Sequence, residues 1–304
     1  MKNHDNDFLF TFIFKSIYII HMKKVCASCI GLNVTKIIKT DNELLPEWLQ
    51  TTDYVSKFIN GQTNFKQIKI KKFDTKLEVN LGTSRSGKYV LYWGAESSIS
   101  PKIKNAKQAY GNFKNNGIAK VNSNGIATLY FNCPQPYSTT VKDKRLKETF
   151  YRHVHFCLSN KLNNNWLSTV YTKIIVCHVS LKNTINKVKR GTAVLINSLP
   201  GTMYGKSHIP NSYNLPHTKL KRMSQNDLIK WFSDVIKMNY PKLHNIIKEG
   251  NLNIYEVPII VYCAHSGCES SNIAAIELLK KGFVNISEFK GGMKEYVAYK
   301  KKVC

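Results

Sequence analysis

The chain carries a cysteine-containing loop that reads Val261-Tyr262-Cys263-Ala264-His265-Ser266-Gly267-Cys268-Glu269-Ser270-Ser271. The apolar run 258–262 before it predicts a buried strand, and the residues after it have the apolar spacing of a helix. A cysteine between the two faces the amino terminus of that helix, where backbone N–H groups and the helix dipole favour an anion. Such surroundings turn a thiol into a nucleophilic thiolate. The alternative is a buried structural cysteine without chemistry.

Strand and helix patterns alternate from residue 191 onward. The segments 193–197, 258–262 and 284–289 are apolar strand candidates, and Ser224 stands three residues before Asp227, a capping-box spacing. Alternating βα units predict a parallel sheet with helices on both faces. Ligands of such sheets bind beyond the carboxyl ends of the strands, which is where Cys263 lies.

Residues from about 190 to 302 resemble a rhodanese-like domain, because several segments fall in that family's order. They are Val194-Leu195-Ile196-Asn197, Gly205-Lys206-Ser207-His208-Ile209-Pro210-Asn211-Ser212-Tyr213-Asn214-Leu215-Pro216, the Cys263 loop, Ala274-Ala275-Ile276-Glu277-Leu278-Leu279-Lys280-Lys281-Gly282-Phe283 and Lys290-Gly291-Gly292-Met293. The resemblance implies a sulfurtransferase that needs no cofactor. Its loop cysteine, here Cys263, accepts sulfane sulfur as a persulfide and passes it to a thiol or cyanide. The implied anion cradle is the rest of the loop, Ala264, His265, Ser266, Gly267, Glu269 and Ser270.

Two departures separate this loop from the common pattern. The family's Asp-x-Arg pair after the first strand is replaced by Asn197-Ser198-Leu199. No Lys or Arg stands between Cys263 and Ser271, so thiosulfate would rest on backbone amides and a protonated His265. A subset of bacterial rhodanese-like domains has a similar Cys-x-x-x-x-Cys-x-x-Ser loop. These features argue against turnover of thiosulfate.

The second loop cysteine favours thiol chemistry. Cys268 can resolve a persulfide or sulfenic acid on Cys263 by forming a disulfide, so both are candidate catalytic residues. The expected partners are a small sulfur donor and a thiol acceptor. One alternative is that Cys268 only packs beneath the loop. Another is that the loop is inert and the protein is a non-catalytic interaction module.

The region before residue 180 has short strand patterns separated by Asn, Gly and Ser turns, which predicts a β-sandwich. The predicted fold is therefore multidomain, a mostly-β sandwich followed by an α/β domain. The predicted parts are a partly apolar leader at 1–60, with disorder as one interpretation, the sandwich at 61–180, a basic linker at 181–190 and the α/β domain at 191–304.

Two histidines in the sandwich form a candidate metal site. His153 and His155 stand two apart in a strand and point to one face, an arrangement common among metal ligands and also among ordinary half-buried pairs. Together with Pro134-Gln135-Pro136-Tyr137 they resemble the β-sandwich of intradiol ring-cleaving dioxygenases. The resemblance implies ferric iron bound by Tyr137, His153 and His155. Tyr110 is the nearest candidate for the family's earlier tyrosine, although its spacing fits poorly.

Composition excludes few functions. The chain has 304 residues, 43% of them hydrophobic, and a formal net charge of +26. We find no arginine-rich stripe or zinc-finger spacing, so the charge indicates a solvated surface rather than a specific nucleic-acid site. The Lys, Asn and Ile bias is typical of AT-rich coding, as in a large viral or protist genome.

The cysteines and the amino terminus bear on location. Eight cysteines are too few for a disulfide-dense scaffold, and we expect a reducing, cytoplasmic compartment. The apolar run 8–20 is interrupted by Lys15 and is too short to span a bilayer. Export remains an alternative because Val25-Cys26-Ala27 has the small-residue pattern of a cleavage site. A further alternative is that translation starts at Met22 instead of Met1. The oligomeric state is not predicted.

Overall fold

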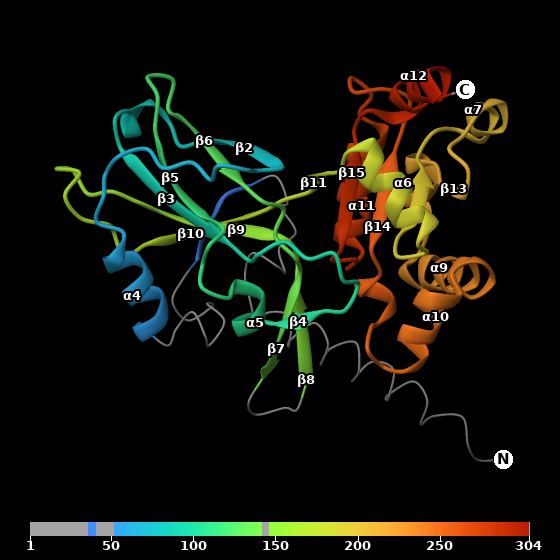
Figure 1. The fold of residues 1–304 in the computed structure, drawn as a ribbon, viewed down its shortest axis with the longest axis horizontal. Helices are drawn as coiled ribbons and strands as arrows, with labels where there is room; N and C mark the ends of the chain where they lie inside the picture. Colours follow the sequence, from blue (N-terminus) through green and yellow to red (C-terminus); the bar gives the residue numbers. More distant parts are fainter. Residues whose placement is uncertain (1–35, 41–51, 142–145, 304) are drawn as a thin grey trace, which may run out of the picture.

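The computed structural model describes residues 36–40, 52–141 and 146–303 and contains two domains (Figure 1). The first part of the chain is mostly strands, and the last part is an α/β domain with a parallel sheet. This is the fold class that the sequence predicts. The apolar run 8–20, Met22 and the pattern at 25–27 lie outside the described residues.

The α/β domain is built on a five-stranded sheet in which every neighbouring pair is parallel, in the order β11-β15-β14-β12-β13. The strands are β11 (Cys177–His178), β12 (Val194–Asn197), β13 (Ser212–Asn214), β14 (Ile259–Tyr262) and β15 (Ile286–Phe289). β12, β14 and β15 are buried at every position, because helices cover both faces of the sheet.

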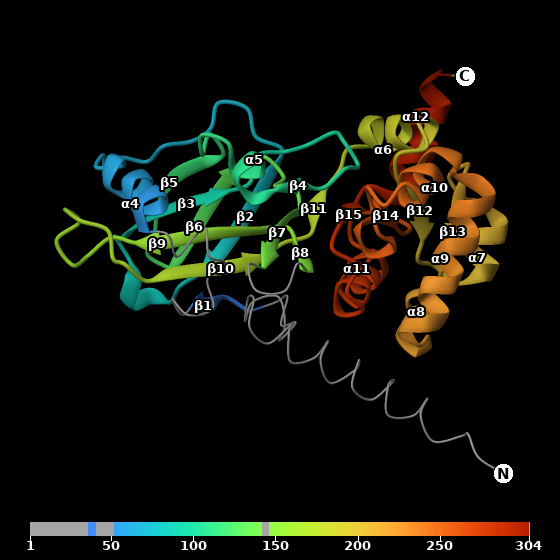
Figure 2. The same cartoon turned by 90° about the horizontal axis from the view of Figure 1, so that it is seen from below.

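The helices divide between the two faces (Figure 2). Leu181 and Val188 pack on one face with Ile260 of β14, whereas Phe232 and Leu278 pack on the other with Val261. The helices are α6 (Leu181–Lys189), α7 (Gly201–Lys206), α8 (His217–Arg222), α9 (Gln225–Asn239), α10 (Pro241–Lys248), α11 (Ser270–Lys280) and α12 (Gly292–Val303), with a 3-10 turn η3 (Ile254–Glu256). The predicted cap of α9 is confirmed, since the Asp227 N–H donates to Ser224 Oγ at 3.1 Å.

The basic linker predicted at 181–190 is wrong, because α6 occupies this segment. Ser180 caps the helix by accepting from the Asn183 N–H, and Leu181, Thr184 and Val188 form its buried face. The lysines of the segment lie on the other faces of the helix. An amphipathic helix this short carries more charge than apolar surface, and so its composition resembles that of a linker.

The β domain (residues 36–40, 52–141 and 146–176) has a central antiparallel sheet in the order β1-β10-β9-β3-β5. β2 pairs with β6, and β7 lies between β4 and β8. The strands are β1 (Ile38–Thr40), β2 (Thr75–Asn80), β3 (Tyr89–Gly94), β4 (Lys104–Asn105), β5 (Asn116–Lys120), β6 (Ile126–Phe131), β7 (Tyr137–Val141), β8 (Leu146–Phe150), β9 (His153–Leu158) and β10 (Val170–Ile174). Two helices, α4 (Thr52–Gly61) and α5 (Ala106–Tyr110), and a 3-10 turn η2 (Thr83–Arg85) complete it.

Both faces of the central sheet are buried. On β3, Leu91 and Trp93 pack into one core, and Val90 and Tyr92 pack into the other. His153 and His155 of β9 are fully buried, because the sheet is covered on both sides. Part of the predicted leader belongs to this domain: β1 pairs with β10, and Phe58 of α4 stacks on Phe113 with ring centroids 4.6 Å apart.

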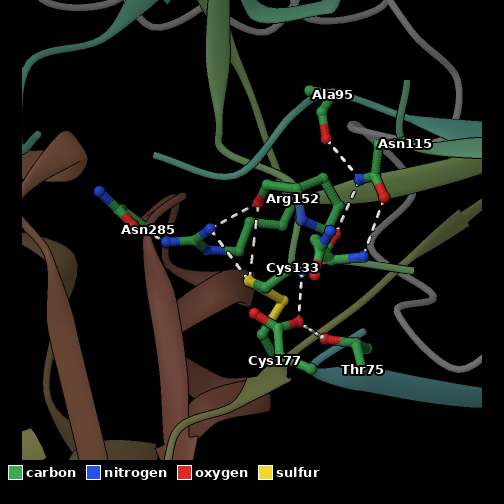
Figure 3. The surroundings of a disulfide bond; sticks show 10 residues. Thr75, Ala95, Asn115, Cys133, Arg152, Cys177 and Asn285 are labelled. Carbon is green, nitrogen blue, oxygen red and sulfur yellow. Dashed lines mark hydrogen bonds between the residues drawn. A yellow bond between two sulfur atoms is a disulfide. The ribbon is translucent and has the colours of Figure 1, made fainter. Parts of the chain in front are cut away.

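The two domains are joined through β11, which continues from β10 and pairs with β15 of the other sheet. A disulfide links Cys133 of the β domain to Cys177 of β11 (Figure 3). The Arg152 guanidinium lies beside this bond and donates to the Pro134 carbonyl at 2.5 Å and to the Asn285 side chain across the junction. The β domain therefore holds one edge strand of the α/β domain in place.

This disulfide contradicts the expectation of a chain that keeps its cysteines reduced. Cys133 and Cys177 are 44 positions apart, and only the tertiary fold brings them together. Disulfides are common in oxidising compartments and rare in reducing ones, and the cytoplasmic location stays a prediction. Among the helices that the structure describes, none has the length and apolar character to cross a bilayer.

Candidate active site

The cysteine loop lies where the sequence predicts, between β14 and the first turn of α11. Its base is held by the start of α12, because the Met293 N–H donates to the Cys263 carbonyl at 3.0 Å and the Lys294 N–H donates to the Ala264 carbonyl at 2.9 Å. Cys263 is fully buried, whereas Cys268 is half-buried. Both are free thiols, so the loop presents an inner and an outer sulfur.

The anion-stabilising groups of the loop act on the outer sulfur. Burial raises the pKa of Cys268, but hydrogen bonds from the Cys263 thiol, the Ala264 and Ser270 backbone and the Ser270 hydroxyl outweigh it. The pKa of Cys268 is therefore below its ordinary value. Ala264 and Ser270 are two of the six residues of the predicted anion cradle, and their hydrogen bonds favour the thiolate of Cys268.

The inner thiol has the opposite tendency. Burial raises the pKa of Cys263, as does its hydrogen bond with Cys268, and the Ser271 backbone contact opposes this only in part. The Cys263 sulfur lies 3.1 Å from Ser271 Oγ and 3.2 Å from the Cys268 carbonyl oxygen. Near neutral pH the inner residue is thus held as a thiol and the outer one is the more readily ionised.

The remaining predicted cradle residues lie at the surface. His265 Nδ1 accepts from the Gly267 N–H at 3.2 Å, a bond that protonation of this nitrogen would break. Glu269 precedes α11, and its carboxylate accepts from Asn272 at 3.3 Å. Ser266 is exposed. None of these four residues, His265, Ser266, Gly267 and Glu269, is a lysine or an arginine. The Asp-x-Arg position is likewise neutral, and Asn197 Oδ1 accepts from the Leu199 N–H at 2.9 Å.

Two residues of the site were not identified from the sequence. Glu288 of β15 is 3% exposed and accepts from Ser271 Oγ at 2.7 Å. His178 of β11 lies 3.2 Å from the other Glu288 oxygen. Burial raises the pKa of Glu288, but the hydrogen bonds from His178 and Ser271 outweigh this and hold the pKa below its ordinary value. The sequence signal that could have identified Glu288 is a carboxylate within an apolar predicted strand.

A second group of candidate residues converges in the β domain. His153 Nε2 lies 3.1 Å from His155 Nε2, 3.1 Å from Tyr137 Oη and 3.3 Å from Tyr110 Oη. The four side chains are at most 4% exposed. The structure thus brings together the three ligands that the sequence proposes and adds Tyr110, the last residue of α5, despite its unfavourable spacing along the chain.

The donor atoms of this group suit a metal ion. His153 Nε2 has one lone pair and can accept one hydrogen bond, but three polar atoms surround it. Hydrogen bonding to this nitrogen therefore accounts for only one of the three contacts. Two ligand atoms that bind one ion at about 2.1 Å and roughly 90–110° lie about 3.0–3.4 Å apart, which is the separation of His153 Nε2 from each of the other three donor atoms. Burial lowers the pKa of His153 to about 4 and that of His155 well below its usual range, so both rings are neutral.

Outer contacts orient the two imidazoles. His153 Nδ1 lies 2.6 Å from the Tyr151 carbonyl oxygen, and so Nδ1 carries the proton and Nε2 the lone pair. His155 Nδ1 lies 2.8 Å from Thr172 Oγ1. Such contacts are usual behind metal-binding histidines. In the described part of the chain no cluster of three or more His, Cys, Asp or Glu has metal-binding geometry, so any ion here depends on the tyrosines.

Comparison with known proteins identifies the α/β domain. Residues 180–299 match the family model of the rhodanese-like domain, and this part of the chain is a rhodanese-like domain. No curated protein is significantly similar to the chain. The family predicted from the sequence motifs is confirmed for this domain. The match begins at residue 180, after the last residue of the β domain.

Several solved structures are similar to part of the chain. An uncharacterized protein from Saccharomyces cerevisiae is 21% identical with a TM-score of 0.31, over 42% of this chain and 97% of that one. A human single-domain sulfurtransferase is 18% identical with a TM-score of 0.29, over 40% and 95%. A 3-mercaptopyruvate sulfotransferase from Escherichia coli is 21% identical with a TM-score of 0.28, over 38% and 41%.

Proposed function

We propose that the rhodanese-like domain transfers sulfane sulfur with the two loop thiols as its working groups. The observation that carries this proposal is that one strand-to-helix loop holds two free thiols, one buried and one half-exposed, with the Cys263 sulfur 3.2 Å from the Cys268 carbonyl oxygen. The directions of their pKa shifts assign the two roles. A lowered pKa supplies the thiolate that attacks a sulfur donor. A raised pKa keeps the neighbouring thiol in reserve for a second step.

The chemistry follows from the positions of the two sulfurs. The Cys268 thiolate attacks the outer sulfur of a persulfide R–S–SH, the S–S bond breaks, and R–S⁻ leaves and takes up a proton. The loop then carries Cys268–S–SH. An acceptor thiolate removes the outer sulfur and restores Cys268. Alternatively, the Cys263 thiolate attacks Cys268 Sγ, which forms the Cys263–Cys268 disulfide and releases HS⁻.

The charge of the loop favours a persulfide donor over thiosulfate. Transfer from thiosulfate expels a sulfite dianion, which needs a nearby cation to stabilise it. The loop between Cys263 and Ser271 contains no Lys or Arg, and His265 Nδ1 accepts a hydrogen bond from the Gly267 N–H. A thiol leaving group has no such requirement.

The test is site-resolved mass spectrometry after treatment with a low-molecular-weight persulfide or with thiosulfate. The persulfide is expected to add one sulfur atom to the loop peptide, and thiosulfate is expected to add far less. Cys268→Ser should abolish the adduct, and Cys263→Ser should trap it on Cys268. Cys157→Ala is the matched control, because burial raises the pKa of Cys157 to about 12. A folded protein that gains no sulfur would favour the non-catalytic interaction module.

We also propose that the β domain binds ferric iron through Tyr110, Tyr137, His153 and His155. The support is that three buried donor atoms lie within 3.3 Å of His153 Nε2, with both histidines neutral and held by hydrogen bonds at their other ring nitrogens. In the dioxygenase family that this region resembles, ferric iron supplies ring-cleaving oxidation. The two tyrosines would provide the negative charge and the two imidazoles the neutral ligands.

Colour and metal content test this second proposal. Tyrosinate bound to ferric iron gives a visible charge-transfer band, which is expected in protein purified from iron-replete cells. Tyr137→Phe should lower the iron content and weaken the band. Tyr171→Phe is the control, because Tyr171 lies on the other face of the sheet, stacked on Phe156. Colourless protein that takes up no iron after folding would leave the β domain without this role.

A further inference from the structure

A line of contacts runs from the inner thiol to the protein surface. Cys263 Sγ lies 3.1 Å from Ser271 Oγ, Ser271 Oγ donates to Glu288 Oε1 at 2.7 Å, and Glu288 Oε2 lies 3.2 Å from His178 Nε2. The first three residues are at most 3% exposed, whereas the His178 side chain is 54% exposed. A buried carboxylate therefore lies between the thiol and a surface histidine.

The direction of these hydrogen bonds determines what Ser271 offers to Cys263. A serine hydroxyl has one proton, and Ser271 gives it to the Glu288 carboxylate. Ser271 can then meet Cys263 only as an acceptor of its S–H. The Ser271 hydroxyl therefore favours the thiol, although the Ser271 backbone contact lowers the pKa of Cys263. The negative charge of Glu288 behind Ser271 also opposes a thiolate, by electrostatic repulsion.

The charge on His178 determines how strongly the Glu288 carboxylate acts on its surroundings. When His178 is protonated, its positive charge at 3.2 Å offsets the carboxylate and so relieves the opposition to a thiolate. Lys290 is the other charged group that acts on Glu288, and Cys268 is the titratable group that faces Cys263. The side chain of His178 reaches the surface, and histidine is the side-chain type that commonly acts as a charge switch near neutral pH.

His178 belongs to the edge strand that the β domain holds. It lies opposite Glu288 in the β11–β15 register, and its neighbour Cys177 is bonded to Cys133. It also precedes residues 180–299, the part of the chain that matches the rhodanese-like family. This contact is thus supplied by the junction between the two domains of this chain.

We propose that Glu288 holds Cys263 as a thiol through Ser271, and that His178 controls this hold by its charge. The inference rests on the proposed function, because it concerns the deprotonation that lets Cys263 release sulfur from Cys268. In that step the S–H bond breaks and the proton goes to water. Protonated His178 favours the step, and loss of its charge opposes it.

The test is the alkylation rate of Cys263 by iodoacetamide, followed by site-resolved mass spectrometry from about pH 5 to about pH 9 in a Cys268→Ser background. Glu288→Gln is expected to raise the rate near neutral pH roughly tenfold, which corresponds to about one pKa unit. His178→Gln is expected to slow the reaction several-fold on the acid side and to leave the alkaline side unchanged. In the Glu288→Gln background, His178→Gln should have no effect.

Internal and matched controls accompany these variants. Protection of Cys157 from the reagent reports an intact β domain, and Glu249→Gln removes an exposed carboxylate far from the loop. His178 is half-exposed, so its variant keeps the inference testable even where Glu288→Gln fails to fold.

A Glu288→Gln rate equal to or below that of the parent would overturn the inference, and a lower rate would make Glu288 a base instead. An equal effect of His178→Gln with and without Glu288 would overturn it as well. The proposed sulfur transfer is tested by a separate experiment. If no persulfide adduct forms, the alkylation rates still report whether Glu288 and His178 control Cys263. If an adduct forms but the alkylation rates do not change as expected, sulfur transfer is supported and this inference is not.

Discussion

Gly292 lies against the backbone of Cys263, so that a Cβ at Gly292 would stand 2.4 Å from the Cys263 carbonyl oxygen. Gly292 also has φ +59°, a conformation that other residues adopt at a cost. The close approach lets the first turn of α12 donate two N–H groups to the base of the loop. The position of both loop sulfurs thus depends on a residue without a side chain.

Gly292→Ala is expected to destabilise the rhodanese-like domain by roughly 2 kcal/mol or more, from the left-handed backbone and the collision together. Chemical denaturation measures this. Gly205→Ala is the matched control, because Gly205 is helical with no atom within 4 Å of the added Cβ, and it should be neutral or stabilising by about 0.5–1 kcal/mol. Equal stabilities for the two variants would contradict the geometry of the loop.

The Cys133–Cys177 disulfide should contribute to the stability of the whole chain. A closed loop of 44 residues corresponds to about 4 kcal/mol of chain entropy in the unfolded state. A reductant is therefore expected to lower the denaturant midpoint of the parent and to leave that of a Cys133→Ala/Cys177→Ala variant unchanged. If the parent midpoint is indifferent to reductant, the bond is absent in solution.

The two loop thiols should ionise in a fixed order as the pH rises. The lowered pKa of Cys268 puts its thiolate first, and the raised pKa of Cys263 puts its thiolate later. Alkylation of the parent is thus expected on Cys268 at neutral pH and on Cys263 only at alkaline pH. Modification of Cys263 ahead of Cys268 would reverse the roles assigned to the two sulfurs.

Glu288 should give the domain a stability that acid removes. Its pKa in the folded protein is below the ordinary value, so its contribution is fully present above the unfolded pKa and is lost as pH falls through the folded pKa. Denaturation below about pH 5 is expected to show a steeper loss of stability for the parent than for Glu288→Gln. Parallel curves would mean that the carboxylate is not preferentially ionised in the folded state.

Much of the rhodanese-like domain was predictable because local signals agree there. Each of these features depends on residues that are adjacent in the sequence: the apolar strands, the Ser224 cap and the loop before α11. The segment 181–190 was wrongly predicted as a linker because α6 has few apolar residues among its lysines. Its cap at Ser180 and the spacing of Leu181, Thr184 and Val188 carried the helical signal.

The site itself was only partly predictable, because its contacts join distant segments. His178 meets Glu288 across 110 positions by the pairing of two parallel strands, and Cys133 meets Cys177 only at the domain junction. The orientation of the Ser270 and Ala264 donors toward Cys268 depends on the loop conformation, which no spacing reveals. Tyr110 joins the histidines because α5 packs against β7 and β9, not through its place in a motif.

The most direct test of sulfur transfer by the two thiols is the mass of the loop peptide after brief exposure to a persulfide donor. We expect one added sulfur atom on the loop peptide, retained on Cys268 in Cys263→Ser. In the parent, we expect the adduct to be followed by a Cys263–Cys268 disulfide with released sulfide. An unchanged peptide in folded protein, with both thiols still free, would contradict sulfur transfer by the two thiols.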